Sequence, residues 1–189
     1  MGRIVFACMA LLLGGCAAVA TVAAVPAALI EGTVDFLRSQ KESLPVSMQT
    51  SLVSVQQGLR RMDLAVDVLE PVKEGYAIEF GNDKLDGTID LKPQTSMLTT
   101  ISIIVHRGVS RQNSVEQAII KVIRDASARR DANEKFNFQG YHHIRILPSI
   151  KARRIGWYRP GALLKASRSR KKDWIRIKMP SGKWGYLKG

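Results

Sequence analysis

The sequence predicts an α+β fold class: a two-layer domain of helices against an antiparallel sheet, followed by a small all-β barrel. Two segments carry apolar residues at helical spacing, and the segments between them alternate apolar and polar residues with the period of strands. Residues 141–189 instead contain short apolar stretches separated by turns, which is typical of a small barrel. With 189 residues and 46% hydrophobic content, the chain has room for both domains.

The basic charge is concentrated at one end of the chain. The sequence has 29 Lys and Arg against 16 Asp and Glu, a formal net charge of +13. Residues 1–140 carry 15 basic and 15 acidic side chains, whereas residues 141–189 carry 14 basic ones and a single acidic one, Asp173. This asymmetry predicts two modules and an anionic partner for the second.

The first sixteen residues have the pattern of an export signal. Arg3 is followed by the apolar residues 4–13 and then by Gly14, Gly15 and Cys16. This pattern resembles a lipobox, in which a peptidase that admits only small residues cuts before a cysteine. The resemblance implies a lipoprotein signal peptide over residues 1–15, cleavage between Gly15 and Cys16, and lipidation of Cys16, whose thiol takes a diacylglyceryl group; palmitate is an expected acyl group of the anchor.

A transmembrane anchor is the alternative, because residues 4–30 are uncharged and are long enough to span a bilayer. Gly14, Gly15 and Pro26 make this stretch a poor continuous helix, which favours the lipoprotein interpretation.

The residues around the predicted cleavage site also indicate a location. Cys8, the other cysteine, lies inside the predicted signal peptide, so the mature chain offers no disulfide, zinc site or cysteine nucleophile. Ala17 follows Cys16, where lipoproteins retained in the inner membrane carry an aspartate. The resemblance therefore implies a lipid anchor in the outer membrane, with the protein facing the periplasm.

The α+β domain is assigned to residues 33–128, after a lipidated tether over residues 16–32 that is rich in alanine and valine. A helix is expected over residues 47–61, and a second one begins at Ser114, where Gln117 completes a capping box. Alternating residues predict antiparallel strands between the helices, at 64–69, 77–80, 88–91 and 98–105.

Residues 1–128 resemble a family of small, uncharacterised bacterial lipoproteins. In that family a lipobox precedes a helix, a β-meander, a segment of the form Thr-x-Ile-x-Val-x-x-Gly, and then a serine and an Ile-rich helix. The chain departs from the pattern at Ser110 and Arg111. The resemblance implies a fold and a location but no activity, and it is carried by Thr99, Ile101, Ile103, Val105, Gly108, Ser114, Ile119 and Ile123.

Residues 129–140 are polar and are assigned as a linker, and residues 141–189 are assigned as the barrel. The tight turn Pro180-Ser181-Gly182 joins its last two strands, because Pro fixes φ and Gly permits a positive φ. Its short strands are expected at 144–147, 154–157, 163–166, 174–179 and 184–187.

This last segment resembles the bacterial SH3-like domain. The resemblance rests on Trp174-Ile175-x-Ile177, on Ser181-Gly182-Lys183 and on Gly185-Tyr186-Leu187. The usual Asn-Val-Arg opening is absent, and Ile144-Arg145-Ile146 stands in its place. Bacterial SH3-like domains mostly bind, many of them to cell-wall peptides, while others pack against a neighbouring domain.

The C-terminal hairpin supplies the candidate ligand site. Strand alternation predicts that Ile175, Ile177 and Met179 form a core, with aromatic and cationic side chains on the opposite face. The alternatives remain that the tryptophans are packed and that the basic run is a solvated loop. The expected site consists of Trp174, Arg176, Lys178, Trp184 and Tyr186, with Arg168, Arg170, Lys171 and Lys172 in a loop that attracts anions.

Other chemistry finds little support in the sequence. Gly-rich phosphate loops and nucleophile elbows are absent from it, and its carboxylates are scattered, so neither an enzyme nor a cofactor is expected. His142 and His143 are adjacent and would point to opposite faces of a strand, so no metal site is expected.

We therefore expect a membrane-anchored lipoprotein of the cell envelope whose cationic SH3-like module binds an anionic polymer, either peptidoglycan or lipopolysaccharide. The alternative is a non-catalytic structural subunit whose module packs on a protein partner in an envelope complex. A nucleic-acid partner is suggested by the sequence pI of about 10.1, but export argues against it.

Overall fold

The computed structural model describes residues 39–129 and 134–189. The predicted signal peptide, the lipidation site at Cys16 and the tether over residues 16–32 lie outside these residues. In the part of the chain that is described, no helix is long and apolar enough to cross a membrane.

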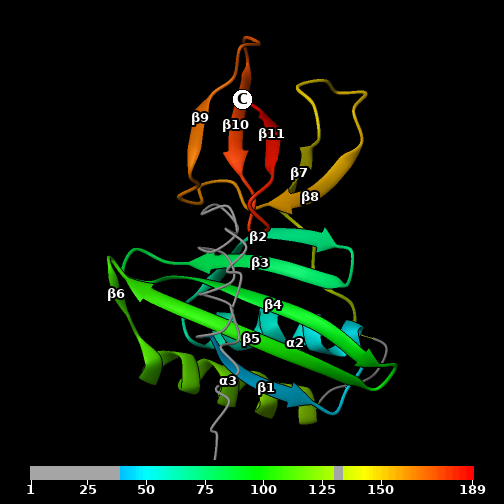
Figure 1. Ribbon diagram of the computed structural model, residues 1–189, viewed down its shortest axis with the longest axis vertical. Coiled ribbons are helices and arrows are strands. Elements are labelled where there is room, and N and C mark those ends of the chain that lie inside the picture. Colours follow the sequence, from blue (N-terminus) through cyan, green and yellow to red (C-terminus); the bar gives the residue numbers. More distant parts are fainter. Residues whose placement is uncertain (1–38, 130–133) are drawn as a thin grey trace, which may run out of the picture.

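The described strands form one antiparallel sheet of eleven strands (Figure 1). Their order is β1-β5-β4-β3-β2-β8-β7-β11-β10-β9, and β6 pairs with β5. Short turns join most neighbours in the N-terminal half, as expected for a meander. The strands are β1 Gln40–Leu44, β2 Ala65–Val72, β3 Gly75–Gly81, β4 Asp86–Thr95, β5 Leu98–Arg107, β6 Ser110–Arg111, β7 His142–Arg145, β8 Arg154–Tyr158, β9 Ala166–Arg168, β10 Trp174–Lys178 and β11 Trp184–Lys188.

Two helices, α2 Met48–Arg61 and α3 Asn113–Ala128, contact each other and lie on one side of the N-terminal strands (Figure 1). The predicted helix over residues 47–61 is confirmed. Ser47 is its N-cap, and its hydroxyl accepts a hydrogen bond from the Thr50 backbone N–H at 3.2 Å.

The predicted capping box of the second helix is wrong. Ser114 lies inside α3, and the N-cap residue Gln112 makes no side-chain capping bond. The first turn is held by Glu116, a buried residue whose carboxylate accepts a hydrogen bond from the Val105 N–H at 3.0 Å and binds Arg111 at 2.8 Å. Contact with β5 therefore sets where this helix starts.

The larger core lies between these helices and the sheet. Its 18 buried side chains include Phe80 from β3, Leu59 from α2 and Ile123 from α3. Phe136, from the segment assigned as a linker, is buried in the same core. The next residue, Asn137, exchanges two hydrogen bonds with Gln56 of α2, at 2.8 and 2.9 Å, so this segment is fixed to the N-terminal region.

The predicted fold class, a two-layer α+β domain followed by a separate small barrel, is wrong. Strand β2 pairs with β3 along one edge and with β8 along the other, where Val68 lies opposite Tyr158 and Leu69 opposite Trp157. The five C-terminal strands therefore extend the same sheet instead of closing into a barrel (Figure 1).

A register shift in β2 explains how one strand serves two cores. The β2–β3 pairing slips between Val66 and Val68, so both side chains are buried but in different clusters. Val66 packs in the larger core. Val68 packs with Ile144, Ile177 and other residues of the C-terminal strands in a second core.

Polar contacts reinforce this junction. Arg159 donates to Asp67 at 2.6 Å, and its backbone N–H donates to the Asp67 carbonyl at 2.8 Å. The carboxylate of Glu70, a buried residue, accepts from both the N–H and the hydroxyl of Ser181, at 3.0 and 2.6 Å. Strand β2 therefore holds the turn between β10 and β11 as well as strand β8.

Candidate functional site

Strands β7, β10 and β11 bring five polar and aromatic side chains to one surface. Arg176 lies opposite Tyr186 and Lys178 opposite Trp184 in the β10–β11 pair, and Arg145 of β7 lies opposite Tyr186. Directly opposed residues of antiparallel strands project to the same face. We call Arg145, Arg176, Lys178, Trp184 and Tyr186 the basic–aromatic face.

The opposite face of these strands is the second core, and it fixes this orientation. Ile177 and Leu187 are buried there beside Met179 and Ile144. A Cβ on Gly185 would lie 2.4 Å from Ile144 Cγ2, so glycine is what allows β11 to approach β7 this closely. The alternation predicted for Ile177, Arg176 and Lys178 is confirmed.

The centre of the basic–aromatic face is a cation–π pair. The guanidinium carbon of Arg176 lies 4.1 Å from the centroid of the Trp184 ring, and its Nε donates to the Ser167 hydroxyl at 3.2 Å. Trp184 remains 44% exposed. Among the described residues, none accepts a hydrogen bond from the two terminal nitrogens of Arg176, so its planar edge is open to an oxyanion.

Two residues of β10 differ from the predicted alternation. Trp174 is only 8% exposed, so its ring does not share the open surface with Trp184. The backbone turns just before it, where the Trp174 N–H donates to the Lys171 carbonyl at 3.3 Å. Ile175, expected in the core, is exposed because it pairs with Arg168 of the edge strand β9, beyond which the sheet ends.

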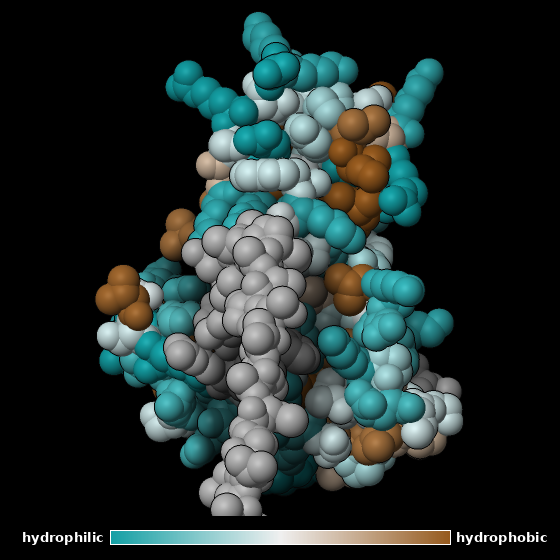
Figure 2. All heavy atoms as spheres, viewed as in Figure 1, coloured by the Kyte–Doolittle hydropathy of each residue, from teal (hydrophilic) through white to brown (hydrophobic). Residues whose placement is uncertain are grey.

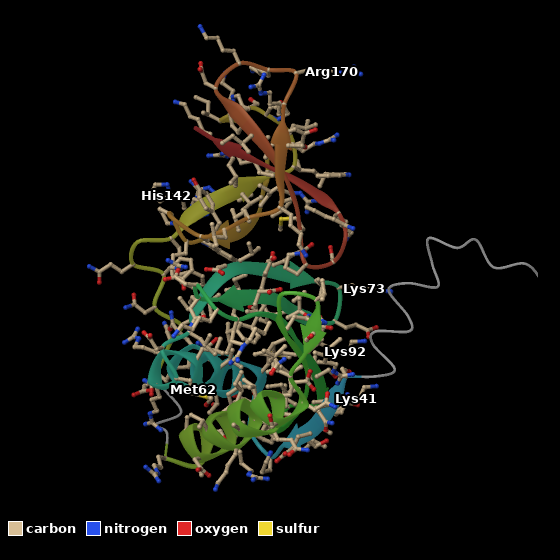
Figure 3. The ribbon with its side chains drawn as sticks, turned by 90° about the vertical axis from the view of Figure 1, so that its left-hand side faces the viewer. Lys41, Met62, Lys73, Lys92, His142 and Arg170 are labelled. Atoms are coloured by element: carbon tan, nitrogen blue, oxygen red, sulfur yellow. The ribbon has the colours of Figure 1, made fainter. Side chains whose placement is uncertain are left out.

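The predicted anion-attracting loop lies at one end of the face. It joins β9 to β10, and Figure 3 shows Arg170 at the tip of the molecule. A hollow of about 410 Å³ lies along this loop, lined by Ser167, Arg168, Lys171, Lys172, Trp174 and neighbouring residues. Arg168 pairs with Ile175 and so faces away from the basic–aromatic face.

The charge of this region is largely unpaired. The C-terminal region, residues 141–189, has 14 basic side chains and one acidic one. Within the described chain, Arg159 is the only one of those 14 that forms an ion pair, with Asp67. The surface therefore carries a positive potential that draws anions over distances near the Debye length.

The two adjacent histidines diverge. The His142 ring packs on Tyr158 at 5.6 Å, and the His143 ring packs on Trp157 at 6.0 Å. Desolvation lowers the pKa of His143, and the positive charges of Arg154 and Arg145 lower it further. Across the described residues, no group of three His, Cys, Asp or Glu side chains is placed to hold a metal ion.

Sequence reasoning missed two members of the site. Arg145 and Ser167 reach Tyr186 and Arg176 only through strand pairing, which no local pattern in the sequence reveals. In comparisons with known proteins, neither a family model nor a curated protein matches the chain. The two family resemblances described above therefore remain predictions.

Proposed function

We propose that this protein is a lipoprotein of the bacterial cell envelope, anchored through Cys16 in the outer membrane, that binds an anionic envelope polymer through the basic–aromatic face. The observation that carries the binding proposal is the Arg176–Trp184 pair, a cation fixed on an exposed ring. The anchor rests on the lipobox pattern of the first sixteen residues.

The chemistry of the face suits peptidoglycan or lipopolysaccharide. An exposed indole offers an apolar plane on which the C–H face of a sugar ring can pack, with the phenol of Tyr186 beside it. The open edge of Arg176 can hold a carboxylate or phosphate through two parallel hydrogen bonds. Lys178 and Arg145 flank the aromatic pair and add positive charge; Arg145 is held in place by a hydrogen bond to the Ala152 carbonyl at 2.7 Å.

Sedimentation with purified sacculi, and separately with lipopolysaccharide, tests this proposal. Trp184→Ala and Arg176→Gln should each weaken binding about 2- to 10-fold, the range expected for loss of an aromatic or cation–π contact. Lys121→Gln, which removes an exposed charge from α3, is the matched control and should leave binding unchanged.

Circular dichroism must show that the variants are folded. If the folded wild-type chain binds neither polymer, or if Lys121→Gln weakens binding as much as Arg176→Gln does, the proposal is contradicted. In that case the alternative, a structural subunit that packs on a protein partner of an envelope complex, becomes the better account.

A further inference from the structure

The turn between β7 and β8 presents apolar side chains to solvent. Ile146, Leu147 and Ile150 are 40%, 59% and 63% exposed. Figure 2 shows a hydrophobic patch on the C-terminal region, on the side where Figure 1 places β7 and β8, with hydrophilic residues around it. Three large aliphatic side chains in one turn are more than scattered surface exposure explains.

Part of the backbone of this turn is hydrogen-bonded within the turn. The Ile146 N–H donates to the Arg153 carbonyl at 3.0 Å, and the Ala152 N–H donates to the Ser149 carbonyl at 3.0 Å. The Ala152 carbonyl in turn accepts from the Arg145 side chain at 2.7 Å. These hydrogen bonds lower the cost at which the turn can enter an apolar medium, because each bonded group needs no water there.

Basic residues follow the apolar ones directly. Lys151, Arg153 and Arg154 are exposed, and none of them forms an ion pair with a described residue. The only acidic residue in the C-terminal region is Asp173, which lies in the β9–β10 loop. Apolar side chains beside unpaired cations complement a surface with an apolar interior and anionic headgroups.

We propose that the turn of residues 146–153 is a membrane-contacting loop, which inserts Ile146, Leu147 and Ile150 into the surface of an anionic lipid bilayer. A protein partner is less well matched, because three side chains of one turn are far smaller than a stable protein interface. The polar rim carries charge of one sign, which matches a field of anionic headgroups. The three apolar side chains are not members of the basic–aromatic face, although Arg145 of that face donates a hydrogen bond to the turn.

A fluorescent probe at position 150 of the full chain tests the loop. Cys8→Ser and Cys16→Ser remove the native thiols, and Ile150→Cys carries a polarity-sensitive dye. Val109→Cys in the same background is the matched control, since Val109 is 100% exposed on the β5–β6 turn of the N-terminal region. The N-terminal 38 residues are common to both proteins, so their affinity for lipid affects both equally.

With vesicles containing phosphatidylglycerol, the dye at position 150 should shift to the blue and brighten by at least about twofold more than the dye at position 109. Lipids brominated on their acyl chains should quench it, and Lys151→Glu with Arg153→Glu should reduce the response. Equal responses at positions 150 and 109 would overturn the proposal. A response at position 150 without quenching by brominated lipid would also overturn it, because the side chains would then stay outside the apolar layer.

Discussion

The two ends of the sheet are built differently. The N-terminal strands and both helices surround 18 buried side chains, whereas the second core contains five, one of which, Val68, belongs to β2. The N-terminal part of the chain is neutral, and the C-terminal region holds all of the excess positive charge. The C-terminal region thus combines the smaller core with the stronger electrostatic repulsion among its own side chains.

This difference explains why the C-terminal strands are joined to the sheet. The segment of fewer than 50 residues contributes only four buried side chains to this core, which falls short of what an independent domain needs. Strand β2 supplies a core residue, a pairing edge for β8 and two carboxylates, Asp67 and Glu70, that bind the C-terminal region. The basic–aromatic face is therefore held in place by the N-terminal region.

The largest expected effect comes from the larger core. Phe80 is fully buried, so Phe80→Ala should lower the free energy of unfolding by about 3–5 kcal/mol. Ile177→Ala in the second core should cost about 2–5 kcal/mol, near the lower end because few side chains surround it. Urea denaturation measures both. A cost for Ile177→Ala that clearly exceeds that for Phe80→Ala would contradict the ranking of the two cores.

The hairpin and helix patterns of the sequence are local, and local patterns predicted much of this architecture. The helix over residues 47–61 and the strands at 77–80 and 88–91 are present because their side-chain periods depend only on neighbours in the chain. Strand β1 was not predicted, since its residues are polar and it pairs with the distant β5.

The separate barrel was wrongly predicted for a related reason. Pairing between β2 and β8 joins residues about ninety positions apart in the chain. The register shift that directs the Val68 side chain into the second core follows from no recognisable pattern in the sequence of β2. In the site, alternation correctly placed Arg176 and Lys178 on one face. It failed at Trp174, whose side chain is buried although it lies on the same face of β10 as Arg176.

A smaller effect is expected at the junction. Glu70→Ala removes the acceptor for the Ser181 N–H and hydroxyl and should cost about 1–3 kcal/mol, because that donor pair is left without its buried partner. Glu74→Ala, an exposed position on the turn between β2 and β3, is the control and should change stability by less than about 0.5 kcal/mol. Thermal unfolding followed by circular dichroism compares the two, and similar melting temperatures for both variants would refute this role of Glu70.

The pH dependence of stability should report the desolvation of Glu79 on β3. Desolvation raises the pKa of Glu79 above its usual 4.5, partly offset by Lys165 of the C-terminal region. Because the pKa of Glu79 is higher in the folded state, Glu79 contributes most to stability below pH 4.5. That contribution is lost as the pH rises through the folded-state pKa. The wild type should therefore gain stability relative to Glu79→Gln as the pH falls from 7 toward 4.5. A stability difference between the two proteins that does not change with pH would contradict the raised pKa of Glu79.

The smallest effect on stability is expected at the loop of the C-terminal region. Changing Arg170, Lys171 and Lys172 together to Gln should alter the free energy of unfolding by less than about 0.5 kcal/mol, since all three are solvent-facing. Binding to sacculi or lipopolysaccharide should fall mainly at low salt, because charge acting at a distance is screened over about 8 Å at physiological ionic strength. Sedimentation at two salt concentrations measures this, and an equal loss at both would indicate direct contact by the loop.

Tryptophan fluorescence and helical circular dichroism, followed in one urea titration, test most directly whether the C-terminal strands depend on the N-terminal region. The tryptophans Trp157, Trp174 and Trp184 all lie in the C-terminal region, and both described helices, α2 and α3, lie in the N-terminal region. Trp157 packs against the larger core, so the titration uses Trp157→Phe, in which the remaining tryptophans, Trp174 and Trp184, report the C-terminal strands and the helices report the N-terminal region. We predict a single transition with the same midpoint for both signals. Two separated transitions, with the tryptophan signal surviving after the helices unfold, would contradict this account.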